Sequence, residues 1–260
     1  MSYGIVYHLE LTPIHKKEKF MEYFHVGDPK LGFHLYKNAI SKDLRTSERL
    51  EETIGNSTDQ LFKWSEAMVG YNTKMPEYRD CVDLKISPAH WPYLTDEFKE
   101  VKAVYDDINN CLTPCLNHYE SRYNFKMEFM EAINFVRYQP GQHFSVHSDH
   151  GFSYSCTLSS VMYLNDDYEG GELWFPYLDI KFKPEYGDIV LFPSTYIFAH
   201  ASLKVTSGVK YAAVTMFDYN DTNHKNTSYG SNAPEQKIIS TKDTVIAKGS
   251  NDPILKGITE

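Results

Sequence analysis

Two residues that can bind a metal ion, His147 and Asp149, stand two positions apart in the sequence. Side chains at positions i and i+2 of a β-strand point to the same face, so this imidazole and this carboxylate can converge on one ion. Two histidines and one carboxylate leave three positions of an octahedral ion open, as an Fe(II) site that binds both a cosubstrate and O2 requires. The pair alone is a weak signal, because a surface strand accommodates both residues without a metal.

A third ligand would have to come from a strand distant in the sequence, and His200 is the strongest candidate. Two nearer histidines compete with it. His143 has the same strand parity as His147 but lies farther along the strand, whereas His150 has the opposite parity and would point away. A core histidine with one hydrogen bond is the alternative interpretation of His200. We predict an iron site formed by His147, Asp149 and His200.

Lys210 follows His200 by ten residues and stands between Gly208 and an apolar run. A dicarboxylate cosubstrate that chelates iron through its keto-acid end leaves its distal carboxylate inside the protein, where a lysine ammonium on an aliphatic stem can neutralise it. A solvated strand lysine is the simpler alternative, but the apolar neighbours favour burial, and unpaired burial would be costly. We predict no separate acid or base residue, since hydrogen abstraction needs no general base.

Periodic patterns indicate the elements that position these residues. Apolar residues recur at intervals of three and four after Thr95, which predicts an amphipathic helix. Further helices are predicted at residues 41–54, with Gly55 placed to end the helix, and at residues 59–69. From about residue 128 the period changes to two, with frequent turn residues, which favours a β-sandwich or barrel. The predicted strands are residues 133–139, 144–148, 157–164, 172–175, 180–183, 188–192 and 210–218.

These patterns divide the chain into three regions. We predict a helix-rich N-terminal region at residues 1–125 that packs on the core, and a catalytic β core at residues 126–220. Residues 221–260 are polar and lack sustained periodicity, so a C-terminal tail that is only partly ordered is expected there.

Composition and charge argue against several classes of partner. The formal net charge is −9 and no Lys or Arg cluster stands out, so no nucleic-acid partner is expected. The first residues lack the segments of a signal peptide, and no apolar run of about 18 residues occurs, so we expect a cytoplasmic protein without a membrane partner. The group Cys111, Cys115 and His118 raises a zinc alternative, but its spacing fits one helical face, and buried thiols are the preferred interpretation.

Several segments around the candidate residues resemble the prolyl 4-hydroxylase branch of the Fe(II)/2-oxoglutarate oxygenases. Their number and order make this resemblance much more specific than the His-x-Asp pair. The segments are Tyr138-Gln139-Pro140-Gly141, His147-Ser148-Asp149, Tyr163-Leu164-Asn165, residues 170–176, residues 187–192, and His200 with Val205, Gly208 and Lys210.

The resemblance implies a mainly β fold with α-helices, in which N-terminal helices support a double-stranded β-helix of the jelly-roll, cupin-like kind. It also implies that Tyr138 and Lys210 bind the carboxylate of 2-oxoglutarate, with Tyr163 as a further candidate. Core packing is the alternative interpretation of both tyrosines. The implied cofactors are Fe(II), 2-oxoglutarate as cosubstrate, O2 and ascorbate.

The same resemblance implies a dioxygenase that hydroxylates a C–H bond of a prolyl residue or another peptide side chain. The alternatives are the same chemistry on a small molecule, such as a free amino acid, and a β-helix protein that binds metal or sugar without turnover. A nucleic-acid demethylase usually carries an arginine pair after the distal histidine, and no Arg follows His200. The sequence predicts no oligomeric state.

Departures from the family pattern concern the substrate. Val214 and Met216 occupy positions where the family usually has threonine and tryptophan, and Lys204 stands where proline is common. We expect the substrate to enter over a rim formed by residues 152–157 and 165–172, in which Tyr154 and Tyr168 pack on the incoming chain.

Overall fold

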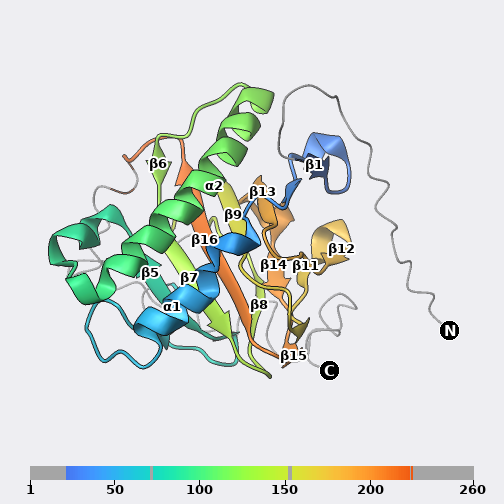
Figure 1. The fold of residues 1–260 in the computed structure, drawn as a ribbon. Helices are drawn as coiled ribbons and strands as arrows, with labels where there is room; N and C mark the ends of the chain where they lie inside the picture. The colour runs from blue at the N-terminus through green and yellow to red at the C-terminus, as the bar shows by residue number, and fades with distance from the viewer. Residues whose placement is uncertain (1–21, 71–72, 152–153, 223, 225–260) are drawn as a thin grey trace.

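Two antiparallel sheets form the centre of the computed structural model, which describes residues 22–70, 73–151, 154–222 and 224 (Figure 1). The larger sheet has nine strands in the order β1-β2-β13-β9-β16-β7-β5-β3, with β6 also paired to β16. The smaller sheet has five strands in the order β12-β11-β14-β8-β4, and β10 pairs with β15 separately. The strands are β1 (Glu22–His25), β2 (His34–Lys37), β3 (Ser65–Glu66), β4 (Arg79–Asp80), β5 (Val82–Ile86), β6 (Phe129–Met130), β7 (Ile133–Tyr138), β8 (His143–His147), β9 (Leu158–Tyr163), β10 (Glu169–Gly170), β11 (Leu173–Phe175), β12 (Ile180–Phe182), β13 (Ile189–Pro193), β14 (His200–Ser202), β15 (Val205–Ser207) and β16 (Lys210–Asp218).

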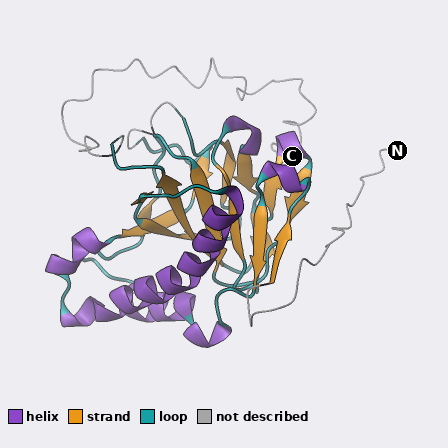
Figure 2. Ribbon diagram, turned by 90° about the horizontal axis from the view of Figure 1, so that it is seen from above, coloured by secondary structure: helices purple, strands orange, loops and turns teal. Residues whose placement is uncertain are grey.

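Helices α1 (Thr46–Ile54) and α2 (Lys99–Tyr123) cover one face of the larger sheet (Figures 1 and 2). The guanidinium of Arg49 on α1 bonds to Glu100 at 2.5 Å and to Asp107 at 2.7 Å, which joins the two helices. The apolar face of α2 shares one buried core with β7, β9 and β13, to which Val101, Val104, Ile108, Phe135, Met162 and Leu191 all belong. This helix therefore stabilises the larger sheet from outside, as its apolar spacing requires.

A second apolar core lies between the two sheets. On β7, Ile133 and Phe135 belong to the core beneath the helices, whereas Val136 and Tyr138 belong to the core between the sheets. Successive strand residues point to opposite faces, so one strand lines both layers. The inner layer joins residues of the larger sheet to those of the smaller one, among them Val161, Tyr163, Leu173 and Phe175.

The seven strands predicted from residue 133 onward are present, each end within one residue of its predicted position. The helix predicted after Thr95 is α2, which continues past Leu112 to Tyr123. The helix predicted at residues 41–54 begins only at Thr46, because Arg45 has a left-handed backbone with φ 46° that separates it from a 3-10 turn.

The prediction of a helix at residues 59–69 was wrong. The Asp59 carboxylate accepts the backbone N–H groups of Leu61 and Phe62 at 2.6 and 2.8 Å, which forms a local turn in place of a helix. Ser65 and Glu66 then pair with β5 as strand β3.

Strands from the first part of the chain complete both sheets. Strand β2 pairs with β13, β5 pairs with β7, and β4 pairs with β8, although all three first-named strands precede residue 125. The division at residue 125 stays a prediction, and most of the predicted tail lies outside the described residues. Within the described part of the chain, no helix is long and apolar enough to cross a membrane.

Candidate metal centre and cosubstrate pocket

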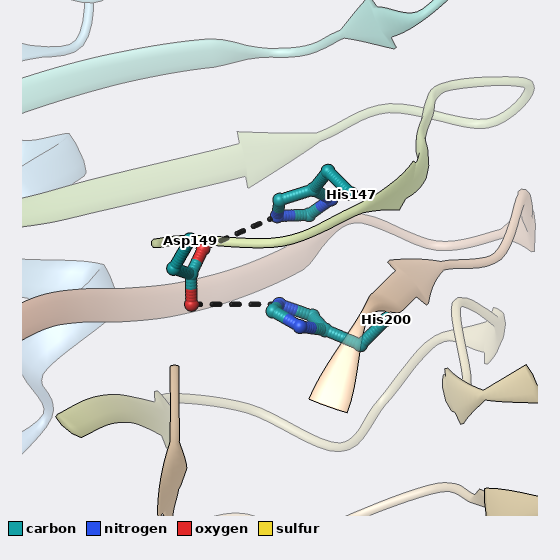
Figure 3. A group of neighbouring side chains, drawn as sticks. All are labelled: His147, Asp149 and His200. Carbon is teal, nitrogen blue, oxygen red and sulfur yellow. Dashed lines mark ion pairs between the residues drawn. The ribbon is translucent and has the colours of Figure 1, made fainter. Parts of the chain in front are cut away.

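The three predicted metal ligands meet between the sheets (Figure 3). His147 ends β8, His200 begins β14, and the two are register partners on neighbouring strands. Asp149 lies two residues beyond the end of β8. Its Oδ1 is 3.4 Å from Nε2 of His147 and its Oδ2 is 3.9 Å from Nε2 of His200. Among the described residues, this is the one group of three or more His, Cys, Asp or Glu whose ligand atoms converge.

Hydrogen bonds to backbone carbonyls fix the orientation of both imidazoles. Nδ1 of His147 donates to the carbonyl of Ser145 at 2.9 Å, and Nδ1 of His200 donates to the carbonyl of Phe198 at 3.0 Å. A carbonyl only accepts, so each Nδ1 carries the proton and each Nε2 presents a lone pair toward Asp149. Such second contacts are the usual way in which proteins hold histidines that ligate metals.

Burial and charge put His200 and Asp149 in the protonation states that a metal needs. Burial lowers the pKa of His200 to about 4, so its imidazole is neutral at pH 7. Burial alone would raise the pKa of Asp149, but the adjacent imidazoles of His200 and His147 outweigh it and hold that pKa well below its usual range. Oδ2 of Asp149 is buried and accepts no hydrogen bond within the described part of the chain. An orphan carboxylate oxygen beside two imidazole lone pairs fits a bound divalent cation.

The predicted cosubstrate residues lie at one end of the same space. Lys210, at the start of β16, is only 2% exposed and lies opposite Tyr138 on β7. Its Nζ donates to the carbonyl of Gly171 at 2.7 Å and to Oγ of Ser202 at 2.8 Å. Burial lowers the pKa of Lys210 to about 7. No carboxylate pairs with this ammonium among the described residues, so an anionic ligand would relieve a buried charge.

Tyrosine rings surround the ammonium of Lys210. The centroids of Tyr138 and Tyr163 are each 5.4 Å from Nζ. The hydroxyl of Tyr163 is buried without a hydrogen-bond partner in the described residues, so it can donate to a ligand. One cavity of about 340 Å³ is lined by the metal triad, both of these tyrosines and Lys210. The structure therefore brings all six predicted site residues together.

One other expectation about the site, the role of Tyr168 at the substrate rim, did not hold. Tyr168 is 2% exposed with its ring 5.9 Å from Nζ of Lys210, so it cannot pack on an incoming chain as expected. Tyr154 does line the cavity, while residues 152 and 153 lie outside the described residues. Nδ1 of His150 forms a hydrogen bond with the backbone carbonyl of Cys156 at 2.8 Å, and His150 is not part of the metal group. Nδ1 of His118 forms a hydrogen bond with the hydroxyl of Tyr36 at 2.9 Å, and Cys111, Cys115 and His118 are not a converging ligand group among the described residues.

Sequence reasoning missed several cavity residues. Ser202 follows His200 by two positions and so shares its strand direction, a signal that could have identified it. Arg79, Glu131 and Asn134 also line the cavity, and single polar residues of this kind carry no motif.

A mainly β fold with a buried His-Asp-His group and a buried lysine in one cavity is the arrangement that a metal-dependent oxygenase with a dicarboxylate cosubstrate requires. Residues 133–218, about a third of the chain, match the family model of the 2OG-Fe(II) oxygenase superfamily. Members of this family use Fe(II), 2-oxoglutarate and O2.

Relatives with curated names include a putative prolyl 4-hydroxylase of Acanthamoeba polyphaga mimivirus, 30% identical over 132 residues, which are 42% of this chain and 53% of that protein. The chain thus spans about half the length of this relative. Prolyl 4-hydroxylase 1 of Arabidopsis thaliana is 27% identical over 203 residues, which cover 62% of this chain and 71% of the relative.

Solved structures show the same fold. The prolyl hydroxylase of Trichoplax adhaerens, solved with a hypoxia inducible factor peptide fragment, has a TM-score of 0.57 at 16% identity and covers 73% of this chain and 84% of its own. The viral collagen prolyl hydroxylase of Paramecium Bursaria Chlorella virus-1, solved with 2OG, has a TM-score of 0.52 at 20% identity over 74% and 98% of the two chains. The predicted fold class, a double-stranded β-helix with supporting helices, is confirmed.

Proposed function

We propose that this protein is an Fe(II)- and 2-oxoglutarate-dependent dioxygenase that hydroxylates a prolyl residue or another side chain of a peptide. One observation carries the proposal: a single cavity joins the His147, Asp149 and His200 group to the buried, carboxylate-free ammonium of Lys210. A protein that only binds a metal would not need the end of the cavity that contains Lys210. The names of the curated relatives favour a peptide over a small molecule as substrate.

The residues of the triad would hold Fe(II) on one face. The carboxylate of Asp149 would offset part of the metal charge, and the imidazoles of His147 and His200 would contribute their Nε2 lone pairs. When bound, Fe(II) and 2-oxoglutarate would supply the oxidising chemistry, in which O2 converts 2-oxoglutarate to succinate and CO2 and one oxygen atom enters a substrate C–H bond.

The other end of the cavity would orient the cosubstrate. Lys210 would bind the distal carboxylate, and the hydroxyls of Tyr138 and Tyr163 would donate hydrogen bonds to it. A charge-assisted pair in a buried site is stronger than a neutral hydrogen bond, so Lys210 carries most of this recognition. Between the two ends, Val136 and Ala212 give the cavity an apolar wall that would exclude water from the reacting atoms.

Coupled turnover tests this proposal. Purified protein with Fe(II), 2-oxoglutarate and ascorbate is incubated with a panel of proline-containing peptides, and succinate and hydroxylated peptide are measured together. We expect equal amounts of both products for at least one peptide, and neither product from Asp149→Ala. Asp96→Ala removes an exposed carboxylate outside the cavity and should leave both products unchanged. Turnover that survives Asp149→Ala, or that is found only with free amino acids, would contradict the proposal.

A further inference from the structure

The cavity continues past the metal group along the inner face of the larger sheet. Strand register arranges its lining in rows that run across the sheet. The first row pairs Lys210 with Tyr138, at the cosubstrate end. A later row holds Val161, Val214, Asn134 and Lys85 on four neighbouring strands. The next row pairs Met216 with Glu131, whose backbone N–H donates to the Met216 carbonyl at 2.9 Å. All these residues line the cavity, and the last two rows form what we call the outer compartment.

Glu131 places a carboxylate in the wall of the outer compartment. No ion pair within 4.0 Å joins it to a Lys or Arg among the residues that the structure describes. Burial raises the pKa of Glu131 and the carboxylate of Asp149 adds to that rise, whereas the more distant Lys85, a hydrogen bond from Tyr154 and the imidazole of His224 oppose it. A cation placed beside this carboxylate would recover the cost of that burial.

Asn134 supplies a second acceptor on the same wall. Its Nδ2 donates to Oδ2 of Asp83 at 3.3 Å. A carboxylate only accepts, so this contact fixes the amide orientation and leaves Oδ1 free for another partner. Oδ1 is buried and accepts no hydrogen bond from the described residues. Asn134 Oδ1 therefore lacks a donor among the described residues, and Glu131 in the next row lacks a Lys or Arg within 4.0 Å, so the two rows together call for a cationic ligand with N–H groups.

Cations that line the cavity do not satisfy these acceptors. Arg79 donates to Oδ2 of Asp83 at 3.1 Å and to the carbonyl of Met68 at 2.8 Å, so its charge is already offset. Lys210 lies in the first row, at the cosubstrate end. Lys85 is exposed, so solvent and salt screen its charge.

We propose that the outer compartment binds the cationic side chain of a lysyl or arginyl residue next to the hydroxylated residue of a peptide substrate. The ammonium or guanidinium would contact Glu131 and Asn134, and its aliphatic stem would lie along Val214 and Met216. The proposal rests on the proposed function, because it takes this cavity to be the substrate site. It gives a role to Val214 and Met216, two of the three positions at which this chain departs from the family pattern.

Peptide affinity tests the proposal without catalysis. Peptides that differ only in one residue beside a single proline, namely lysine, its uncharged isostere norleucine, or glutamate, are titrated into protein loaded with Mn(II) and 2-oxoglutarate. The varied residue is placed before the proline in one set and after it in another. In at least one set, the lysine peptide should bind about 10-fold more tightly than the norleucine peptide, the gain typical of a hydrogen bond to a charged group. The glutamate peptide should bind least.

Variants assign that preference to one side chain. Glu131→Gln should reduce it to about 2-fold or less. The fold should survive, because glutamine has the same size and can still accept the hydrogen bond from Tyr154, and the backbone carbonyl of residue 131 still accepts from the hydroxyl of Thr215 at 3.0 Å. Glu128→Gln is the matched control, since it removes an exposed carboxylate three residues earlier and should keep the preference. Lys85→Met should strengthen lysine-peptide binding by removing a like charge.

Equal affinity for lysine and norleucine peptides in both sets, or a preference that Glu131→Gln leaves unchanged, would overturn the cation site. A small probe separates this result from failure of the proposed function. Nα-acetyl-lysine N-methylamide and its norleucine counterpart contain no proline. Lysine selectivity of this pair, lost in Glu131→Gln, would support the cation site even if no prolyl peptide were hydroxylated. Hydroxylation without any charge preference would refute the cation site alone.

Discussion

Replacing Lys210 with methionine should stabilise the protein and weaken its binding of 2-oxoglutarate. The ammonium is buried and has no carboxylate partner in the described residues, and burial lowers its pKa from 10.5 to about 7. At about 1.4 kcal/mol per pKa unit, this charge reduces the free energy of unfolding by roughly 4 kcal/mol at most near pH 7. Methionine keeps the apolar stem and removes the charge, so Lys210→Met should unfold at higher urea concentration when 2-oxoglutarate is absent.

The pH dependence of that effect has a definite sign. The unfolded chain holds a proton on this lysine up to about pH 10.5, whereas the folded chain releases it near pH 7. Between these values the unfolded state binds more protons, so the free energy of unfolding of the wild-type protein should rise with pH. Lys210→Met should lose that part of the rise. Urea unfolding at several pH values between 7 and 10 measures the difference directly.

Lys210→Met should lower the affinity for 2-oxoglutarate, although it raises the free energy of unfolding. Losing a charge-assisted contact to a buried carboxylate costs about 2–5 kcal/mol, which corresponds to about 30-fold or more in affinity. Calorimetric titration of 2-oxoglutarate into Mn(II)-loaded wild type, Lys210→Met and Lys204→Met provides the assay. Lys204 is exposed on the same segment, so its replacement should change neither quantity. A Lys210→Met protein that is less stable, or that binds 2-oxoglutarate normally, would refute this reasoning.

Three further predictions test other parts of the structure. Tyr138→Phe removes one hydroxyl beside Lys210, so 2-oxoglutarate affinity should fall by about 5-fold, far less than in Lys210→Met. A normal affinity would show that this tyrosine does not bind the cosubstrate. Gly187→Ala should lower the free energy of unfolding, measured in urea, by about 1–3 kcal/mol. Gly187 has φ +84°, and an added Cβ would lie 2.2 Å from the Ile40 carbonyl oxygen. Unchanged stability would contradict that contact. Burial lowers the pKa of His34 from 6.5 to about 3, so the unfolded state binds more protons between these values and stability should fall as pH drops below about 6.5. His34→Gln should flatten that acid dependence, and an unchanged slope would show that other groups cause it.

The spacing of residues along the sequence was enough to predict the three metal ligands. Strand parity places His147 and Asp149 on one face, and a third ligand must then come from a remote histidine. The structure adds what spacing could not show. Asp149 reaches the site from beyond the end of β8, and the backbone contacts of both histidines depend on strand ends. Lys210 could be predicted from its apolar neighbours, whereas Tyr138 and Tyr163 entered only through the family resemblance. The roles of all six residues remain proposals.

Short elements escaped prediction because their stability comes from partners. Strand β14 has three residues and β2 has four, too few for a periodic pattern, and each forms by pairing with longer strands. The outer compartment was missed for a similar reason. Glu131 and Asn134 are single polar residues that acquire meaning only when sheet register places them side by side. Tyr168 was misplaced because sequence does not show which turn residues fold back into the core.

Isotope labelling tests the central claim most directly, namely that one cavity couples a metal bound by His147, Asp149 and His200 to 2-oxoglutarate and a peptide. The reaction is run under 18O2 with a peptide identified by the succinate assay, and both products are analysed by mass spectrometry. We expect one labelled oxygen atom in succinate and one in the hydroxylated residue for each turnover, and no labelled product from Asp149→Ala. Unlabelled hydroxyl groups, or labelled products in Asp149→Ala, would contradict the account.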